Sequence, residues 1–302
     1  MARTCFYCSE AAELTDHGIP LWVPPLVGLE GEPVEHLVAD EPPPREPDGP
    51  ADQLPVSVPR HAELGSAQPD ARLAQQIGDA ITERERLEVE SYSAVLLCPG
   101  CADALAALDA RSLPLVTPLV EGEAVTFGSA EQRTLAAWGT RTAYAVLAVE
   151  RKSRGIPKSH RRAIRERSEP HEHVFVGIGR YRGSDIGVLA GRLAVPFGDA
   201  EVEAYSVLCV FGHLVLKVVG LHRRPAGSEI RPPQGEIARV WPDAPGEVTW
   251  PPLWSLSEQA LEHAFTQVPF YLPFDYSEVR YLGPGKKIPA KRKRTEGLRG
   301  RQ

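Results

Sequence analysis

Two C-x-x-C pairs, far apart in the chain, constrain this sequence more than any other feature. The first pair is Cys5 and Cys8, and the second is Cys98 and Cys101. Four thiolates of this kind can hold one zinc ion in tetrahedral geometry. The chain start lacks the apolar core of a secretory signal, so we expect a cytoplasmic protein, in which paired C-x-x-C spacing indicates zinc before disulfides. The sequence therefore predicts one structural zinc.

The long gap between the pairs is compatible with a single zinc site. Stretching the loop from about 25 to about 90 residues costs about 1 kcal/mol of closure entropy, whereas a structural zinc contributes on the order of 10 kcal/mol. Pro99 and Gly100 form the turn of the second pair, and a helix-forming run over 102–109 follows directly. A knuckle, a hairpin, a second knuckle and a helix make a treble clef. The alternative is two unrelated cysteine pairs.

The rest of the 302-residue chain is helical at first and rich in strands later. Apolar periodicity predicts helices over about 70–88, 130–151 and 257–266, and a short basic helix over 158–167. Runs rich in Val, Ile, Phe and Tyr predict antiparallel strands over 173–182, 187–196 and 202–221, with a turn at 211–213. The segment from about 30 to 70 is rich in Pro, Glu, Asp and Gly, which predicts a disordered or loosely packed insertion.

These elements predict an α+β protein. We expect an N-terminal treble-clef zinc domain extended by helices over 1–155, a β-rich domain of unknown role over 171–283, and a basic disordered tail over 284–302. The fifth cysteine, Cys209, lies in an apolar run and is expected to be a small buried core residue. No apolar run reaches the roughly 18 residues of a membrane span, so we expect no membrane partner.

The charge distribution is uneven along the chain. Eight Lys or Arg residues and a single Glu lie between Arg151 and Arg167, although the formal net charge of the chain is −6. Such a density of positive charge can neutralise several phosphates, which predicts a nucleic-acid partner, with DNA favoured. The residues expected to bind it are Lys158, Arg161, Arg162 and Arg165. A solvated helix face explains the same pattern, and without interleaved aromatics base stacking is not indicated.

The residues after the first cysteine pair resemble a known family. Asp16 and His17 follow the C-x-x-C knuckle, and an apolar residue and Pro20 come next, which is similar to the opening of zinc-containing HNH endonucleases. The resemblance implies that Asp16 binds a catalytic Mg²⁺ or Mn²⁺ ion and that His17 is the general base. Some bacterial HNH-type proteins also carry a W-A-x-K-T-A helix, and the run from Trp138 to Ala143 is similar to it.

The sequence departs from the HNH pattern at two catalytic positions. Ala102 stands where the family has a metal-binding Asn or His after the last cysteine, and Ser93 stands where it often has Asn. Asp103 is the one nearby replacement, about 100° further around the helix. The sequence thus predicts a zinc-stabilised, HNH-like nucleic-acid-binding protein, with a degenerate endonuclease site. The alternative function is a non-catalytic protein-interaction module whose β-rich domain binds a partner protein.

One further pair of imidazoles stands out. His171 and His173 flank Glu172, and this alternation can place both rings on one face of a strand as metal ligands. The sequence shows no evident third ligand. We therefore expect a surface pair at the entry to a strand.

Overall fold

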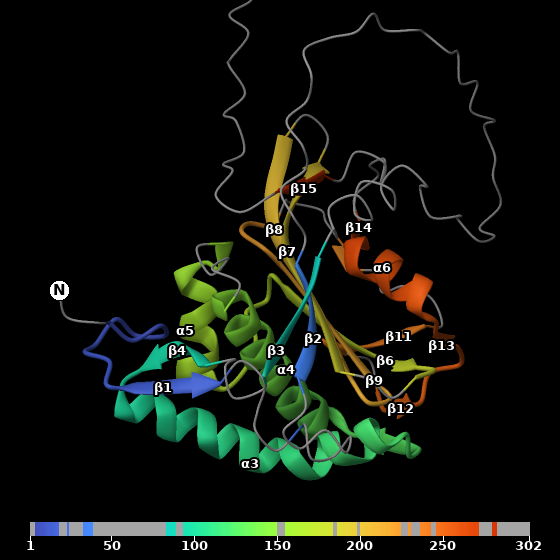
Figure 1. Cartoon of the computed structure of the whole chain (residues 1–302), viewed down its shortest axis with the longest axis horizontal. Helices are drawn as coiled ribbons and strands as arrows, with labels where there is room; N and C mark the ends of the chain where they lie inside the picture. Colours follow the sequence, from blue (N-terminus) through green and yellow to red (C-terminus); the bar gives the residue numbers. More distant parts are fainter. Residues whose placement is uncertain are drawn as a thin grey trace, which may run out of the picture.

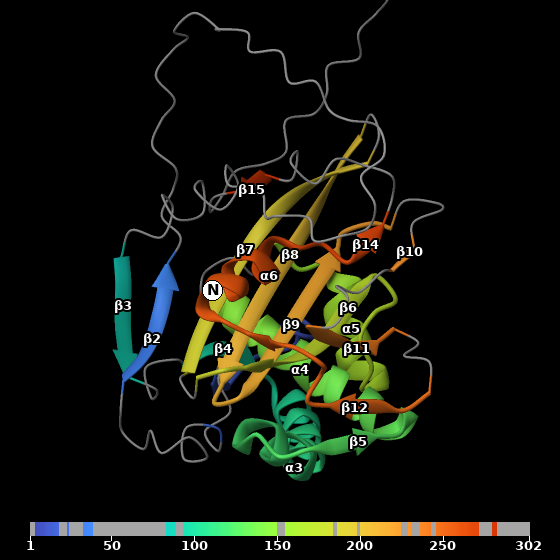
Figure 2. The ribbon, with the colours of Figure 1, turned by 90° about the vertical axis from the view of Figure 1, so that its right-hand side faces the viewer.

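The computed structural model shows a large sheet with helices on both of its faces (Figures 1 and 2). It describes residues 4–17, 23, 33–38, 83–88, 93–149, 155–183, 186–197, 200–224, 229–230, 236–242, 246–271 and 280–282. The helices are α3 (Pro99–Glu121), α4 (Ser129–Val149), α5 (Lys158–Arg167) and α6 (Glu258–Thr266). The chain is therefore of the α+β class, as expected.

The strands fall into the central sheet and three small pairs. The central strands are β11 (Ile237–Trp241), β6 (Val174–Tyr181), β9 (Leu214–Leu221), β8 (Ala200–Phe211), β7 (Ile186–Phe197), β2 (Pro33–Val38) and β3 (Glu83–Glu88), in that spatial order, with β13 (Ser255–Leu256) on β6 and β15 (Arg280–Leu282) on β7. The small pairs are β1 (Leu14–His17) with β4 (Ser93–Leu97), β5 (Val125–Phe127) with β12 (Val248–Trp250), and β10 (Glu229–Ile230) with β14 (Phe270–Tyr271).

The four strands from β6 to β9 form the antiparallel centre of the sheet. The turn between β8 and β9 falls at Gly212 and His213, and Gly212 has a φ of 57°, the left-handed conformation that glycine adopts without strain. The three strand ranges expected from composition and the turn at 211–213 are confirmed. Side chains alternate between the faces, so Leu216 and Val218 pack on one side and Val215 and Val219 on the other.

Two hydrophobic layers result from this alternation. α6 covers one face, where Leu261 and Phe265 join the apolar side chains of β6, β8 and β9. α4 covers the other face, and α3 and α5 lie beyond it (Figure 1). Cys209 is fully buried on the α4 side, as expected for a small core residue, and burial raises the pKa of its thiol.

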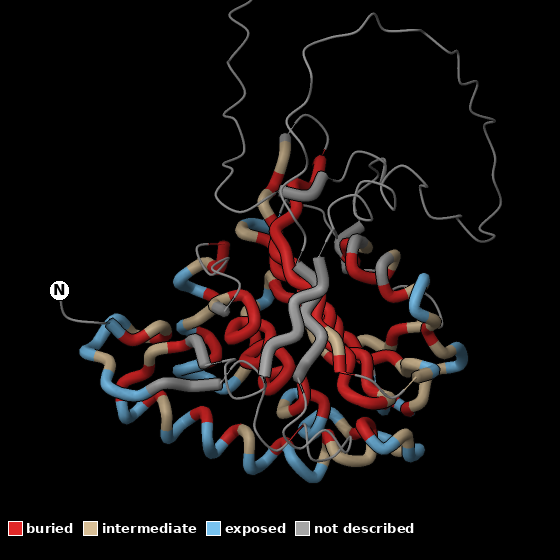
Figure 3. Tube along the Cα trace, viewed as in Figure 1, coloured by how far each residue is buried: buried red, intermediate tan, exposed pale blue. Residues whose placement is uncertain are grey.

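α4 is the central helix of the molecule. An amphipathic helix with one apolar stripe was expected, but residues 135–147 are buried on every side (Figure 3). The reason is tertiary: the sheet packs on one side of the helix, and α3, β4 and α5 pack on the others. The single core around α4 reaches from the cysteines to Trp250, so the expected domains 1–155 and 171–283 share it.

One sequence-based expectation in the first part of the chain is wrong over part of its length, and a second expected segment contains a strand. The helix expected over 70–88 is a strand over its last residues, because Glu83–Glu88 pairs with β2. The insertion expected over 30–70 contains β2, whose backbone pairs antiparallel with β3 and parallel with β7. Partners distant in sequence impose these strands, and local composition carries no signal of them. The remainder of both segments and the tail 284–302 lie outside the described residues.

α3 is much longer than the expected helix over 102–109. Its buried side continues at helical spacing through Leu105, Leu108, Ser112, Val116 and Leu119. Pro114 lies within it and lacks the N–H that would bond to the carbonyl of Ala110. Both residues are exposed, so water can supply the missing donor. Among the described helices, none is both long enough and apolar enough to cross a membrane.

Candidate metal centre

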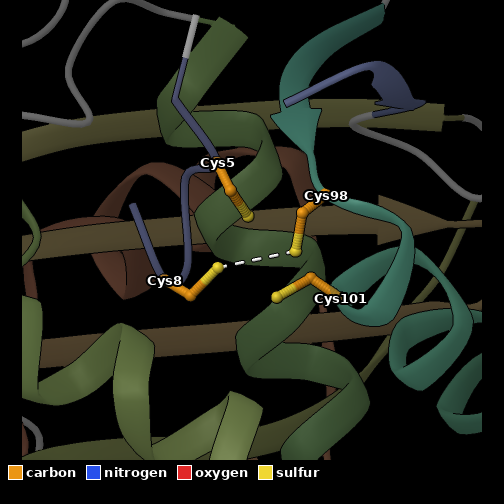
Figure 4. Close-up of side chains that lie close together, drawn as sticks. All are labelled: Cys5, Cys8, Cys98 and Cys101. Atoms are coloured by element: carbon orange, nitrogen blue, oxygen red, sulfur yellow. Dashed lines mark hydrogen bonds between the residues drawn. The ribbon is translucent and has the colours of Figure 1, made fainter. Parts of the chain in front are cut away.

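The four predicted cysteines come together at the junction of the N-terminal segment, β4 and α3. Cys5 and Cys8 lie in a tight turn closed by hydrogen bonds from Ser9 N to Cys5 O (3.0 Å) and from Cys5 N to Glu10 O (2.7 Å). Cys98 is the N-cap of α3, and Cys101 lies in its first turn. All four sulfur atoms point toward a common centre (Figure 4).

The geometry of this centre fits a tetrahedral ion. The four sulfur atoms lie within 4.8 Å of one another, and the Sγ atoms of Cys8 and Cys98 are 3.5 Å apart. Four thiolates about 2.3 Å from a zinc ion would be about 3.8 Å apart, whereas a disulfide requires about 2.05 Å. All five cysteines are free, and three of these four are buried. The expected four-cysteine cluster is confirmed as a group that could hold a metal ion.

Backbone amides prepare one of the thiols for a metal. Burial raises the pKa of Cys5, but hydrogen bonds from the backbone of Cys98, Cys8 and Tyr7 outweigh it and lower the pKa to about 7. Burial and the neighbouring thiols raise the pKa of Cys101. A divalent cation at the centre would lower the pKa of these thiols instead, because it favours the thiolate form of every ligand.

Two arginines of α5 face the cysteines and compensate their charge. Four thiolates around one zinc ion carry a net charge of about −2. Arg161 donates through Nη1 to the carbonyl of Phe6, and its guanidinium lies 4.7 Å from the centroid of the Phe6 ring. Arg165 lies 3.8 Å from Glu10 and interacts electrostatically with Cys8, Cys101 and Cys98. These two cations attach α5 to the first knuckle.

The four predicted nucleic-acid-binding residues therefore divide into two groups. Arg161 is half-buried and Arg165 is exposed, and both face the cysteine centre. Lys158 and Arg162 face solvent, and Arg162 forms an exposed pair with Glu166 at 3.7 Å. Arg167, at the last position of the helix, is also exposed, and its charge acts on His171.

The predicted catalytic residues lie next to the cysteine centre in the chain. Asp16 and His17 are in β1, where their backbones pair with Val95 and Ser93 of β4, and their side chains lie outside the described residues. Asp103 is exposed on α3. In the described part of the chain, neither Asp103 nor Ala102 belongs to a cluster of metal-binding side chains.

The run from Trp138 to Ala143 belongs to the core. Trp138, Thr140 and Thr142 are fully buried in α4, and Arg141, with 3% of its side chain exposed, forms an ion pair with Asp109 of α3 at 3.2 Å. The arginine thus joins two helices inside the protein. Gly139 allows close packing, because a Cβ there would lie 2.6 Å from Cδ1 of Leu216.

A second group of metal-binding side chains lies about His160. One ring nitrogen each of His160, His171 and His173 lies within 4.8 Å of the other two. The expectation of a two-histidine surface pair missed His160, which is buried in α5. Its burial follows from the helical spacing of His160, Ala163 and Ile164, the three buried positions of this otherwise basic helix. That spacing was the available signal.

Comparisons with known proteins return no match for this chain among family models, curated proteins or solved structures. The resemblance to HNH endonucleases therefore depends on its motif residues alone.

Proposed function

We propose that this is a zinc-stabilised nucleic-acid-binding protein in which the four cysteines hold a structural zinc ion. The order of elements supports a treble clef: a knuckle at Cys5 and Cys8, the antiparallel pair β1 and β4, a second knuckle, and α3. Zinc would close the loop between the two knuckles and attach the N-terminal segment to the core around α4. Duplex DNA is the proposed partner, bound through its phosphates.

One observation carries the nucleic-acid part of the proposal. Arg161 and Arg165 contact Phe6 and Glu10 beside the cysteine centre, and Lys158 and Arg162 of the same helix are left exposed to solvent. A rigid helix presents a fixed row of charges at low entropic cost, which suits contact with a phosphate backbone. We define the outer basic face by its residues, Lys158 and Arg162, which are four apart and therefore lie on one side of the helix.

The test distinguishes the contribution of the outer basic face to DNA binding from that of the net charge of the protein. The variant Lys158→Glu/Arg162→Glu reverses two outer charges, and the control Arg111→Glu/Arg133→Glu makes the same charge change at exposed sites on α3 and α4. Binding to a labelled DNA duplex is measured at several salt concentrations. Loss of two phosphate contacts should reduce the slope of log affinity against log salt by about 2, whereas the control should keep the wild-type slope. Equal slopes in both variants would contradict the proposal.

A nuclease is the narrower form of the same proposal. The strand β1, which contains Asp16 and His17, pairs with β4, and β4 leads into the second knuckle; this pairing supports the narrower proposal. Such an enzyme should cut DNA with Mg²⁺ or Mn²⁺, with Asp16 and Asp103 near the ion. His17→Ala should abolish cleavage and leave DNA affinity unchanged, because a general base acts on the rate. If the wild type and the variant both fail to cut DNA, the nuclease proposal is abandoned and only the DNA-binding proposal is retained.

The rival function is a protein-interaction module. Leu253 and Trp254, with 82% and 57% of their surface exposed, are adjacent apolar side chains beside β13. An exposed apolar pair of this kind fits a protein partner better than DNA. Retention on DNA that does not depend on salt, or no retention at all, would favour this rival.

A further inference from the structure

The cluster of His160, His171 and His173 brings together a helix and the entry to a strand. His160 lies in α5, and the other two histidines immediately precede β6. The His160 ring stacks on that of His171 with centroids 4.5 Å apart and an interplanar angle of 19°, and His173 lies edge-on to both. Three imidazoles therefore bring several ring nitrogens, each a possible metal ligand, close to one another.

The hydrogen bonds of His160 prepare one ring nitrogen for a metal. Its Nδ1 lies 2.9 Å from the hydroxyl of Tyr205, which lies 3.0 Å from the hydroxyl of Tyr144. Its Nε2 is fully buried and has no hydrogen-bond partner among the described residues. If Nδ1 donates to Tyr205, and Tyr205 donates to Tyr144, then Nε2 presents a lone pair. A metal-binding histidine typically makes such a bond through its other nitrogen.

We propose that these three histidines form a second metal site, of the zinc class, whose fourth position is open to water. Three imidazoles and one exchangeable position are a common ligand set for zinc. His160 is the fixed ligand at the buried end. His171 and His173 are only partly buried, so the ion enters from their side.

The separations of the ring nitrogens are compatible with one ion. Nitrogen ligands about 2.0 Å from a tetrahedral ion are about 3.3 Å apart, and the three ring nitrogens lie within 4.8 Å of one another. Nδ1 of His171 accepts a hydrogen bond from the backbone N–H of His173 at 3.1 Å. If Nδ1 of His171 is the ligand atom, a metal bond would replace this hydrogen bond.

Charged side chains of both signs lie around the cluster. Glu172 lies 3.8 Å from Nε2 of His173, and Arg167 and Arg224 act electrostatically on His171 and His173 respectively.

Metal counting on the full-length chain tests the proposal. The zinc-loaded wild type should hold two zinc ions per chain after dialysis, and His171→Asn/His173→Asn should hold one. The control His263→Gln alters a histidine of α6 that lies outside the cluster and should hold two. Tyr205→Phe removes only the hydroxyl that orients His160 and should weaken the second zinc about 10- to 100-fold.

Cobalt substitution distinguishes the two sites. Co²⁺ at the cysteine centre gives intense thiolate charge-transfer absorption, whereas Co²⁺ at the histidines gives weaker bands without it. The double histidine variant should lose only the weaker bands. If wild type and variant bind the same amount of metal with the same spectrum, the second site does not exist. Loss of thiolate absorption alone would instead count against the cysteine centre.

Discussion

Replacing Gly139 by alanine sets helix propensity against packing, and the structure decides which effect is larger. In a helix interior, alanine is favoured over glycine by about 1 kcal/mol. The new Cβ, however, would lie 2.6 Å from Cδ1 of Leu216 and 3.4 Å from Cγ1 of Val176. Ordinary carbon contacts are about 3.5–4.0 Å, so Leu216 would have to move by about 1 Å.

Leu216 and Val176 are both fully buried between α4 and the sheet, so the displaced methyl group has no free space to enter. Overpacking of this kind costs about 1–3 kcal/mol. Subtracting the gain in propensity, we expect Gly139→Ala to lower the free energy of unfolding by about 1 kcal/mol. The alanine of the similar W-A-x-K-T-A motif would thus be destabilising here, because α4 approaches β9 closely.

Urea denaturation followed by tryptophan fluorescence measures this effect, with zinc present throughout and the m-value checked for constancy. Gly100→Ala is the control, because Gly100 is also in a helix and a Cβ added there would have nothing within 4 Å. Leu216→Val should be less costly in the Gly139→Ala protein than in the wild type, with a coupling of at least about 0.5 kcal/mol. A Gly139→Ala protein more stable than the wild type would refute the reasoning.

Three further predictions address the metal centre, the α5 attachment and the buried lysine. Cys98→Ser should abolish thiolate charge transfer with Co²⁺, and a chelator should then lower the melting temperature of the wild type but not of the variant. Arg161→Ala should cost about 1.5–3 kcal/mol in urea denaturation because it removes a charged donor to Phe6, whereas the exposed Arg162→Ala should change stability by less than about 0.5 kcal/mol. Burial lowers the pKa of Lys217 well below its usual range, and Nζ donates to Ser206 Oγ (2.6 Å) and Phe265 O (2.5 Å). The unfolded chain then binds more protons than the folded one between the folded pKa and the usual lysine pKa, so stability rises with pH in that window by up to about 1.4 kcal/mol per unit. Lys217→Met should remove that rise, and parallel stability curves for the two proteins would disprove it.

The sequence by itself determined the features that depend on local chemistry and short-range periodicity. Cysteine pairs with two intervening residues are typical of zinc knuckles, and the four cysteines do converge. The three buried positions of α5 repeat at the helical period, and β6 to β9 follow from runs rich in Val, Ile, Phe and Tyr, so the local sequence carries these patterns. Cys209 was identifiable as a core residue from its apolar neighbours.

The tertiary structure alone decided which side chains meet. β2 and β3 exist through pairing with each other and with β7, and α3 extends past its prolines because its buried side keeps packing. Arg161 looked like its neighbour Arg162, yet its place on the helix turns it toward Phe6 at the metal centre. His160 joins His171 and His173 only because α5 packs against the start of β6. Contacts of this kind depend on how elements pack in space, and no local pattern encodes them.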